Sequence, residues 1–206
     1  MKEKVVDNIM NNIKNNNSNL SSTKLAEIRY GLYGLYSLLT KTSVVILLAI
    51  VLNIFKEFII FLIFYSLLRG VGYGCHAKTN LQCWIFSTVL LLGIPLVSIN
   101  IHISENIKII MWLILFINFL AFAPADTKKR PMINKIRKLK FKSAILLLSF
   151  IYLYLIIKYE NISNLVIGSM VLEGFLVNPL GYILMGQKVR SKLNNINLFK
   201  QKIDWR

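Results

Sequence analysis

Apolar residues in this chain gather in long runs, and polar or basic segments separate the runs. A helix that crosses a membrane needs about 20 apolar residues in succession. Four runs approach or exceed that length, and each of them predicts one spanning helix. They cover residues 84–103, 107–124, 143–157 and 162–184, of which the third is short and the last contains Glu173, Asn178 and Pro179.

The first apolar region is ambiguous, because Asn53, Lys56 and Glu57 interrupt it. Residues 43–68 can form one long span. Alternatively, residues 30–52 form a first span that contains Lys41, and residues 55–68 return as a shorter second span. The apolar pattern alone does not decide between one span and two.

Residues 1–29 follow a different pattern. Val6, Ile9, Met10 and Ile13 have the i, i+3, i+4, i+7 spacing of one helix face. This spacing predicts a short amphipathic helix on the membrane surface, with a frayed polar terminus as the alternative. The polar stretch 15–23 then separates it from the first apolar region, and we expect no signal peptide because an apolar core and a cleavage site are missing.

The composition supports a membrane protein. Hydrophobic residues make up 55% of the chain and charged residues 17%, against about 45–50% and about 25% in soluble domains. An ordinary soluble domain and a disordered chain are therefore excluded. The net charge of +16 fits basic loops that face anionic lipid. A nucleic-acid-binding protein is also basic but does not need such apolar runs, so we expect no nucleic-acid partner.

The distribution of charge also decides between one span and two in the first apolar region. The loop of residues 125–142 and the tail of residues 185–206 are strongly basic, and so is the segment 1–29. Basic segments favour the cytoplasmic side, which requires an even number of crossings between residues 29 and 125. We therefore predict an all-α integral membrane protein of the cell membrane, one domain over residues 1–206. It has about six transmembrane helices, both termini in the cytoplasm, and a cytoplasmic loop between the second and third spans.

That loop, residues 69–83, carries the candidate chemistry. His76 can take a proton from the Cys83 thiol and return it to a leaving amine, the minimum of a thiol peptidase. On one straight helix the two residues would lie about 10.5 Å apart along the axis, too far for proton transfer. Either the chain bends between them, or Cys83 begins the next helix, whose N-terminus would favour the thiolate. The other histidine, His102, is expected to be an idle residue near an external helix end.

Other interpretations of these residues remain open at this point. A cysteine and a histidine at this spacing are often idle. Cys75, His76 and Cys83 supply three of the four ligands that structural zinc takes, so we expect no metal and no cofactor. Glu173 and Asn178 inside one span also fit a transporter subunit or a non-enzymatic scaffold, although the chain has no internal repeat.

The order of Arg69, Gly74, His76, Ala77 and Cys83 (R-x4-G-x-H-A-x5-C) resembles the accessory gene regulator B (AgrB) family. These proteins are membrane endopeptidases of Gram-positive quorum sensing. The segment EIRYGL at 27–32 precedes the first span, as is usual in that family. The segment APADTKKRP at 123–131 is similar to the family's proline-bracketed basic loop.

The resemblance implies cleavage of a small AgrD-type precursor peptide on the cytoplasmic side. It implies that Cys83 is the nucleophile, that His76 is the general base, and that Arg69 and Gly74 shape the site. A Cys or Ser side chain of the peptide then attacks the thioester on Cys83, which gives a cyclic thiolactone or lactone. Cys75 replaces a usually small residue and receives no role.

The resemblance supplies no third catalytic residue. Glu173 and Asn178 are candidates to orient His76, because polar groups inside a span are often functional, but either can instead bond to a neighbouring helix. The precursor's leaving tail is typically acidic, so Lys128, Lys129 and Arg130 are predicted to attract it as well as anionic lipid. A homodimer is a further candidate assembly.

Overall fold

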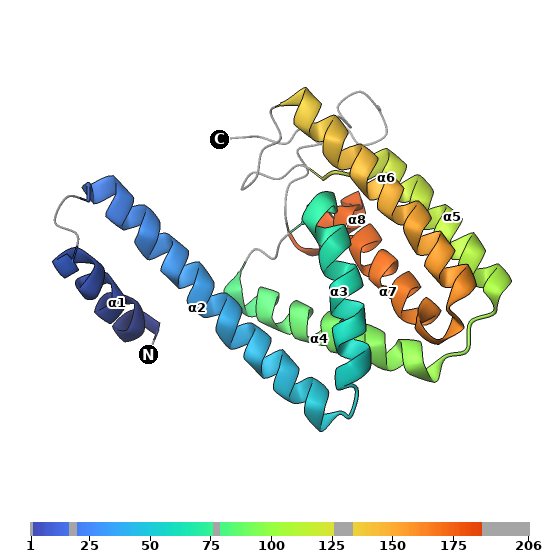
Figure 1. Ribbon diagram of the computed structural model, residues 1–206, viewed down its shortest axis with the longest axis horizontal. Helices are drawn as coiled ribbons and strands as arrows, with labels where there is room; N and C mark the ends of the chain where they lie inside the picture. Colours follow the sequence, from blue (N-terminus) through green and yellow to red (C-terminus); the bar gives the residue numbers. More distant parts are fainter. Residues whose placement is uncertain (1, 17–19, 76–78, 126–133, 187–206) are drawn as a thin grey trace. The chain divides into compact units, whose positions relative to one another are not determined.

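The computed structural model describes residues 2–16, 20–75, 79–125 and 134–186 (Figure 1). These residues form eight helices and contain no strand. The all-helical prediction is therefore confirmed for the described part of the chain. The helices group into two compact units, Met1–Val51 and Leu52–Arg206.

The first unit is a helical pair. Helix α1 (Lys2–Asn16) packs against helix α2 (Ser22–Val51). Val6 and Met10, two of the four positions on the predicted apolar face, are buried. Arg29 of α2 also donates to Asp7 of α1 over 2.6 Å. The helix is thus confirmed, with two of its four apolar positions buried, and its place on the membrane surface stays a prediction.

Helix α3 (Phe55–Gly72) begins after a break at residues 52–54. Asn53 has a φ of 61°, a left-handed conformation that asparagine adopts more readily than most residues. One continuous helix through residues 43–68 is therefore excluded. The break lies where the charge pattern required two helices.

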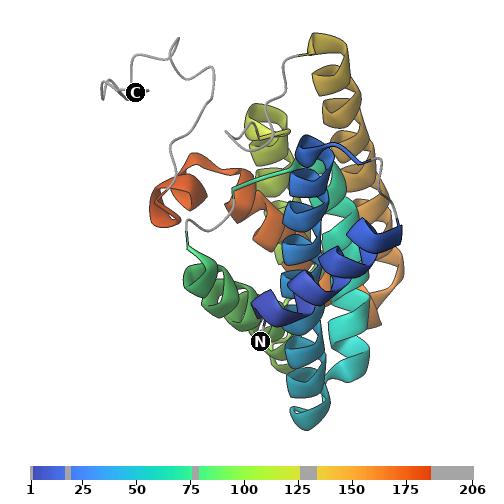
Figure 2. The same cartoon turned by 90° about the vertical axis from the view of Figure 1, so that its left-hand side faces the viewer.

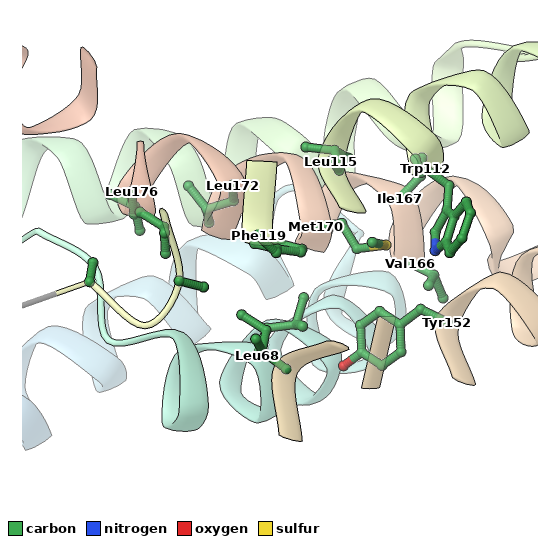
Figure 3. Close-up of a cluster of buried hydrophobic side chains, with 14 of the residues drawn as sticks. Leu68, Trp112, Leu115, Phe119, Tyr152, Val166, Ile167, Met170, Leu172 and Leu176 are labelled. Carbon is green, nitrogen blue, oxygen red and sulfur yellow. The ribbon is translucent and has the colours of Figure 1, made fainter. Parts of the chain in front are cut away.

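The second unit is built around helix α7 (Glu160–Val177). Around it lie α3, α4 (Asn80–Asn100), α5 (Glu105–Phe122) and α6 (Lys135–Lys158), and α7 contacts all four. Apolar side chains from these helices meet on α7, where Met170 lies among Leu68, Phe119 and Tyr152 (Figure 3). The unit therefore has one continuous apolar core.

Polar side chains tie the helices of this core together. The indole nitrogen of Trp112 donates to the carbonyl of Ser149 over 2.8 Å, and the Tyr152 hydroxyl donates to the carbonyl of Phe64 over 2.7 Å. Buried polar groups must find such partners, because water is absent there. These bonds fix how α3, α5 and α6 align along their axes.

The last apolar run differs from the prediction. One helix over residues 162–184 is wrong, because α7 ends at Val177 and a short helix α8 (Pro179–Leu184) follows at an angle (Figure 2). Pro179 lacks an N–H and disfavours helical backbone in the residue before it. The side chain of that residue, Asn178, accepts from the Leu180 N–H over 3.0 Å and caps α8.

Four of the described helices are long and apolar enough to cross a membrane: α2, α4, α5 and α6. This composition is that of a membrane protein. Helices α3 and α7 have 18 residues each and carry charged side chains, among them Arg69 and Glu173. The count of six spans and the cytoplasmic side of residues 69–83 therefore stay predictions.

Candidate active site

The motif residues lie where α3 ends and α4 begins. Helix α3 ends at Gly72, and Tyr73, Gly74 and Cys75 are not helical. Helix α4 begins at Asn80, so Cys83 lies in its first turn. This confirms the geometry in which Cys83 belongs to the start of a new helix. His76 is outside the described residues.

The start of α4 is defined by a capping box. The Thr79 hydroxyl accepts from the Gln82 N–H over 3.2 Å, and the Gln82 side chain accepts from the Thr79 N–H over 3.3 Å. Cys83 follows directly, half-buried and not in a disulfide.

His102 cannot serve Cys83 within one chain. It follows the other end of α4 and is exposed. At 1.5 Å per residue, that end of α4 lies about 25 Å from Cys83 along the helix axis. The chain has two histidines, so His76 is the histidine left to act as a base for Cys83.

Cys75 is a buried residue held by its backbone. Its N–H donates to the carbonyl of Leu176 over 2.7 Å, and its carbonyl accepts from Arg69 Nη2 over 2.7 Å. The side chain is 1% exposed. Burial raises the pKa of the Cys75 thiol to about 11, so the thiol stays protonated at neutral pH and is a poor nucleophile.

Arg69 also pairs with the buried carboxylate of Glu173. Arg69 Nη1 lies 3.6 Å from Glu173 Oε2, and the Glu173 side chain is 0% exposed. The sequence singled out both residues but not their pairing. The available signal was that an ionisable residue within a span usually has a charged partner. Asn178, the other candidate to orient His76, uses its side-chain oxygen to cap α8.

Gly74 occupies a position that disfavours residues with a side chain. Its φ is +60°, and a Cβ there would meet Arg69 Nη1 and the carbonyl oxygen of Leu176. A side chain would therefore disturb both groups that hold the backbone of Cys75. This is a physical reason for the glycine that the sequence pattern singled out.

The predicted basic contacts, Lys128, Lys129 and Arg130, lie outside the described residues. Ala125 closely precedes them, and its N–H donates to the carbonyl of Gly72 over 2.9 Å. The chain thus enters the basic loop beside the end of α3. Among the described residues, no group of three His, Cys, Asp or Glu side chains is placed to hold a metal ion.

These features define an all-helical protein with helices long and apolar enough to cross a membrane, with the Cys83 thiol in the first turn of α4 and with Arg69 3.6 Å from the buried carboxylate of Glu173. The profile of the family described as Accessory gene regulator B matches residues 4–177. The chain belongs to this family. Family membership supports a role in the accessory gene regulator quorum-sensing system.

Curated relatives agree with this match. Accessory gene regulator protein B of Staphylococcus aureus (strain Newman) is 29% identical over 167 residues, which cover 81% of this chain and 88% of the relative. The protein of the same name from Staphylococcus lugdunensis is 29% identical over 164 residues, 79% of this chain and 87% of the relative. No solved structure matches the chain significantly.

Proposed function

We propose that this protein is a membrane cysteine endopeptidase that cleaves an AgrD-type precursor of a cyclic autoinducing peptide. Cys83 is the nucleophile and His76 the general base. The placement of Cys83 carries this assignment: a half-buried thiol in the first turn of a capped helix, in a chain whose other thiol is buried and protonated. Membership of the accessory gene regulator B family supports the choice of substrate.

The reaction proceeds by two acyl transfers. His76 takes the proton of the Cys83 thiol, and the thiolate attacks a peptide carbonyl of the precursor. The C–N bond breaks, His76 gives its proton to the leaving amine, and the N-terminal part of the precursor stays on Cys83 as a thioester. A Cys or Ser side chain of the bound peptide then attacks that thioester, which closes a thiolactone or lactone ring and releases the Cys83 thiol.

Cleavage by the full-length protein tests the assignment. The protein is co-expressed with a candidate short precursor that has an amphipathic start, a central Cys or Ser and an acidic end. Gel electrophoresis should show the precursor shortened, and mass spectrometry should show an N-terminal product lighter by one water than the linear fragment. A precursor that stays intact in the presence of folded protein would reject the peptidase.

The basic loop supplies a site for the leaving tail in this proposal. The chain enters the loop from Ala125, which is hydrogen-bonded to the end of α3, and Lys128, Lys129 and Arg130 follow closely. Positive charge beside a site attracts an acidic segment and raises its local concentration. The same residues also contribute to lipid binding and topology, at about 1 kcal/mol per charge.

Replacing Lys128, Lys129 and Arg130 together by Gln is expected to lower cleavage of the normal precursor by about tenfold or more at physiological salt. A precursor with a neutralised tail should be affected much less, since the attraction is already absent. Five basic residues of the loop remain, Lys135, Arg137, Lys138, Lys140 and Lys142, so topology should survive. Equal losses for both precursors would reject tail recognition.

A further inference from the structure

Glu173 is a buried ionisable residue that the two-residue mechanism does not use. It lies on α7, fully buried, and Arg69 Nη1 of α3 is 3.6 Å from its carboxylate. A carboxylate in apolar surroundings is costly to bury unless a cation accompanies it. Such a pair adds little net stability compared with well-packed apolar residues. The position of the pair therefore needs a reason other than the stability of the core.

The reason lies in the second terminal nitrogen of the Arg69 guanidinium. While Nη1 faces Glu173, Nη2 donates to the carbonyl of Cys75 over 2.7 Å. On the other side, the Cys75 N–H donates to the carbonyl of Leu176, one turn of α7 after Glu173. Helix α7 thus holds the backbone of Cys75 at both its N–H and its carbonyl, once directly and once through Arg69.

Two glycines make room for this arrangement. A Cβ on Gly72 would meet Glu173 Oε1, and a Cβ on Gly74 would meet Arg69 Nη1. Gly70, on the same helix as Gly72, has no atom within 4 Å of its Cβ position. Side chains are therefore missing where the carboxylate and the guanidinium approach the end of α3.

We propose that Glu173 is a positioning residue: it holds Arg69 so that Arg69 fixes the backbone of Cys75, from which the chain continues directly into His76. We call Glu173, Arg69 and Leu176 together the α7 clamp. The link to catalysis rests on the proposed function, since His76 acts as the base there. The clamp holds the backbone of Cys75 in place whether or not the protein cleaves a peptide.

Cys75 reports on the clamp directly. In a Cys83→Ala background it is the chain's remaining thiol, and it is 1% exposed. The measurement is the rate at which N-ethylmaleimide alkylates Cys75 in the full-length protein in mild detergent. Glu173→Gln removes the charge that holds Arg69, so the rate is expected to rise about tenfold or more. Gly72→Ala should do the same, because its methyl group displaces the carboxylate.

Two variants serve as matched controls. Gly70→Ala adds the same methyl group to α3 in open space and should leave the rate unchanged. Ser163→Ala removes a buried hydrogen bond from Lys108 to α7, 2.7 Å long, at a site about 15 Å from Glu173 along the helix axis. It should also leave the rate unchanged, although it perturbs the same helix.

Activity completes the test, measured with Cys83 intact. Glu173→Gln should lower kcat by about tenfold or more and change KM less than about twofold, because the base is displaced while the precursor still binds. Unchanged alkylation in both Glu173→Gln and Gly72→Ala would overturn the clamp, and so would an equal rise in Ser163→Ala. Faster alkylation in a protein that never cleaves the precursor would support the clamp and reject the peptidase.

Discussion

Replacing Cys83 by alanine is expected to abolish cleavage of the precursor, whereas Cys75→Ala is expected to retain most of it. Loss of a catalytic nucleophile lowers the rate by about a thousandfold or more. Cys75 cannot take over, because it is 1% exposed and burial raises the pKa of its thiol to about 11. Removing its sulfur should cost only about 1 kcal/mol of stability.

The measurement is the fraction of precursor cleaved after co-expression, normalised to the amount of each variant in the membrane. Cys83→Ser is a closer steric match and should also be inactive, because a hydroxyl is a much weaker nucleophile at neutral pH. Mass spectrometry adds a direct observation, since the wild-type protein should carry the precursor's N-terminal part on Cys83. Cleavage that persists in Cys83→Ala would disprove the mechanism.

Much of the fold could be predicted because it follows from local chemistry. The break at Asn53 was predicted from charge, and the structure has a left-handed residue there. Helix α4 begins at Asn80, four residues before the predicted start at residue 84, because Thr79 and Gln82 form a capping box that the apolar pattern does not report. The end of α7 before Asn178 was not predicted, although Pro179 stands beside it. The run of apolar residues 162–184 is long enough for one span, and hydropathy alone does not show that the proline ends the helix.

The site was less predictable, because its contacts join distant parts of the chain. Arg69 and Glu173 were each singled out, but no local pattern says that two helices so far apart in sequence place them together. The same holds for the bond between Cys75 and Leu176. Periodicity and motif spacing report on neighbours along one element, whereas pairing between helices depends on how their surfaces pack.

Gly74→Ala is expected to lower cleavage by about ten- to a hundredfold, because a strained backbone costs about 1–3 kcal/mol. Two causes contribute. A φ of +60° disfavours residues with a side chain. In addition, a Cβ would lie 2.9 Å from the carbonyl oxygen of Leu176, which accepts the N–H of Cys75. The backbone of α7 cannot move aside without disturbing the helix.

Gly74→Asn separates these causes. Asparagine adopts a positive φ more readily than alanine, but it carries the same Cβ. If space beside Leu176 and Arg69 is decisive, Gly74→Asn should cleave as poorly as Gly74→Ala. If backbone conformation is decisive, it should recover a large part of the activity. Gly70→Ala is the control and should cleave like the wild type, since its Cβ meets open space. Wild-type cleavage by both Gly74 variants would show that the close approach of α7 to this segment is not required for the reaction.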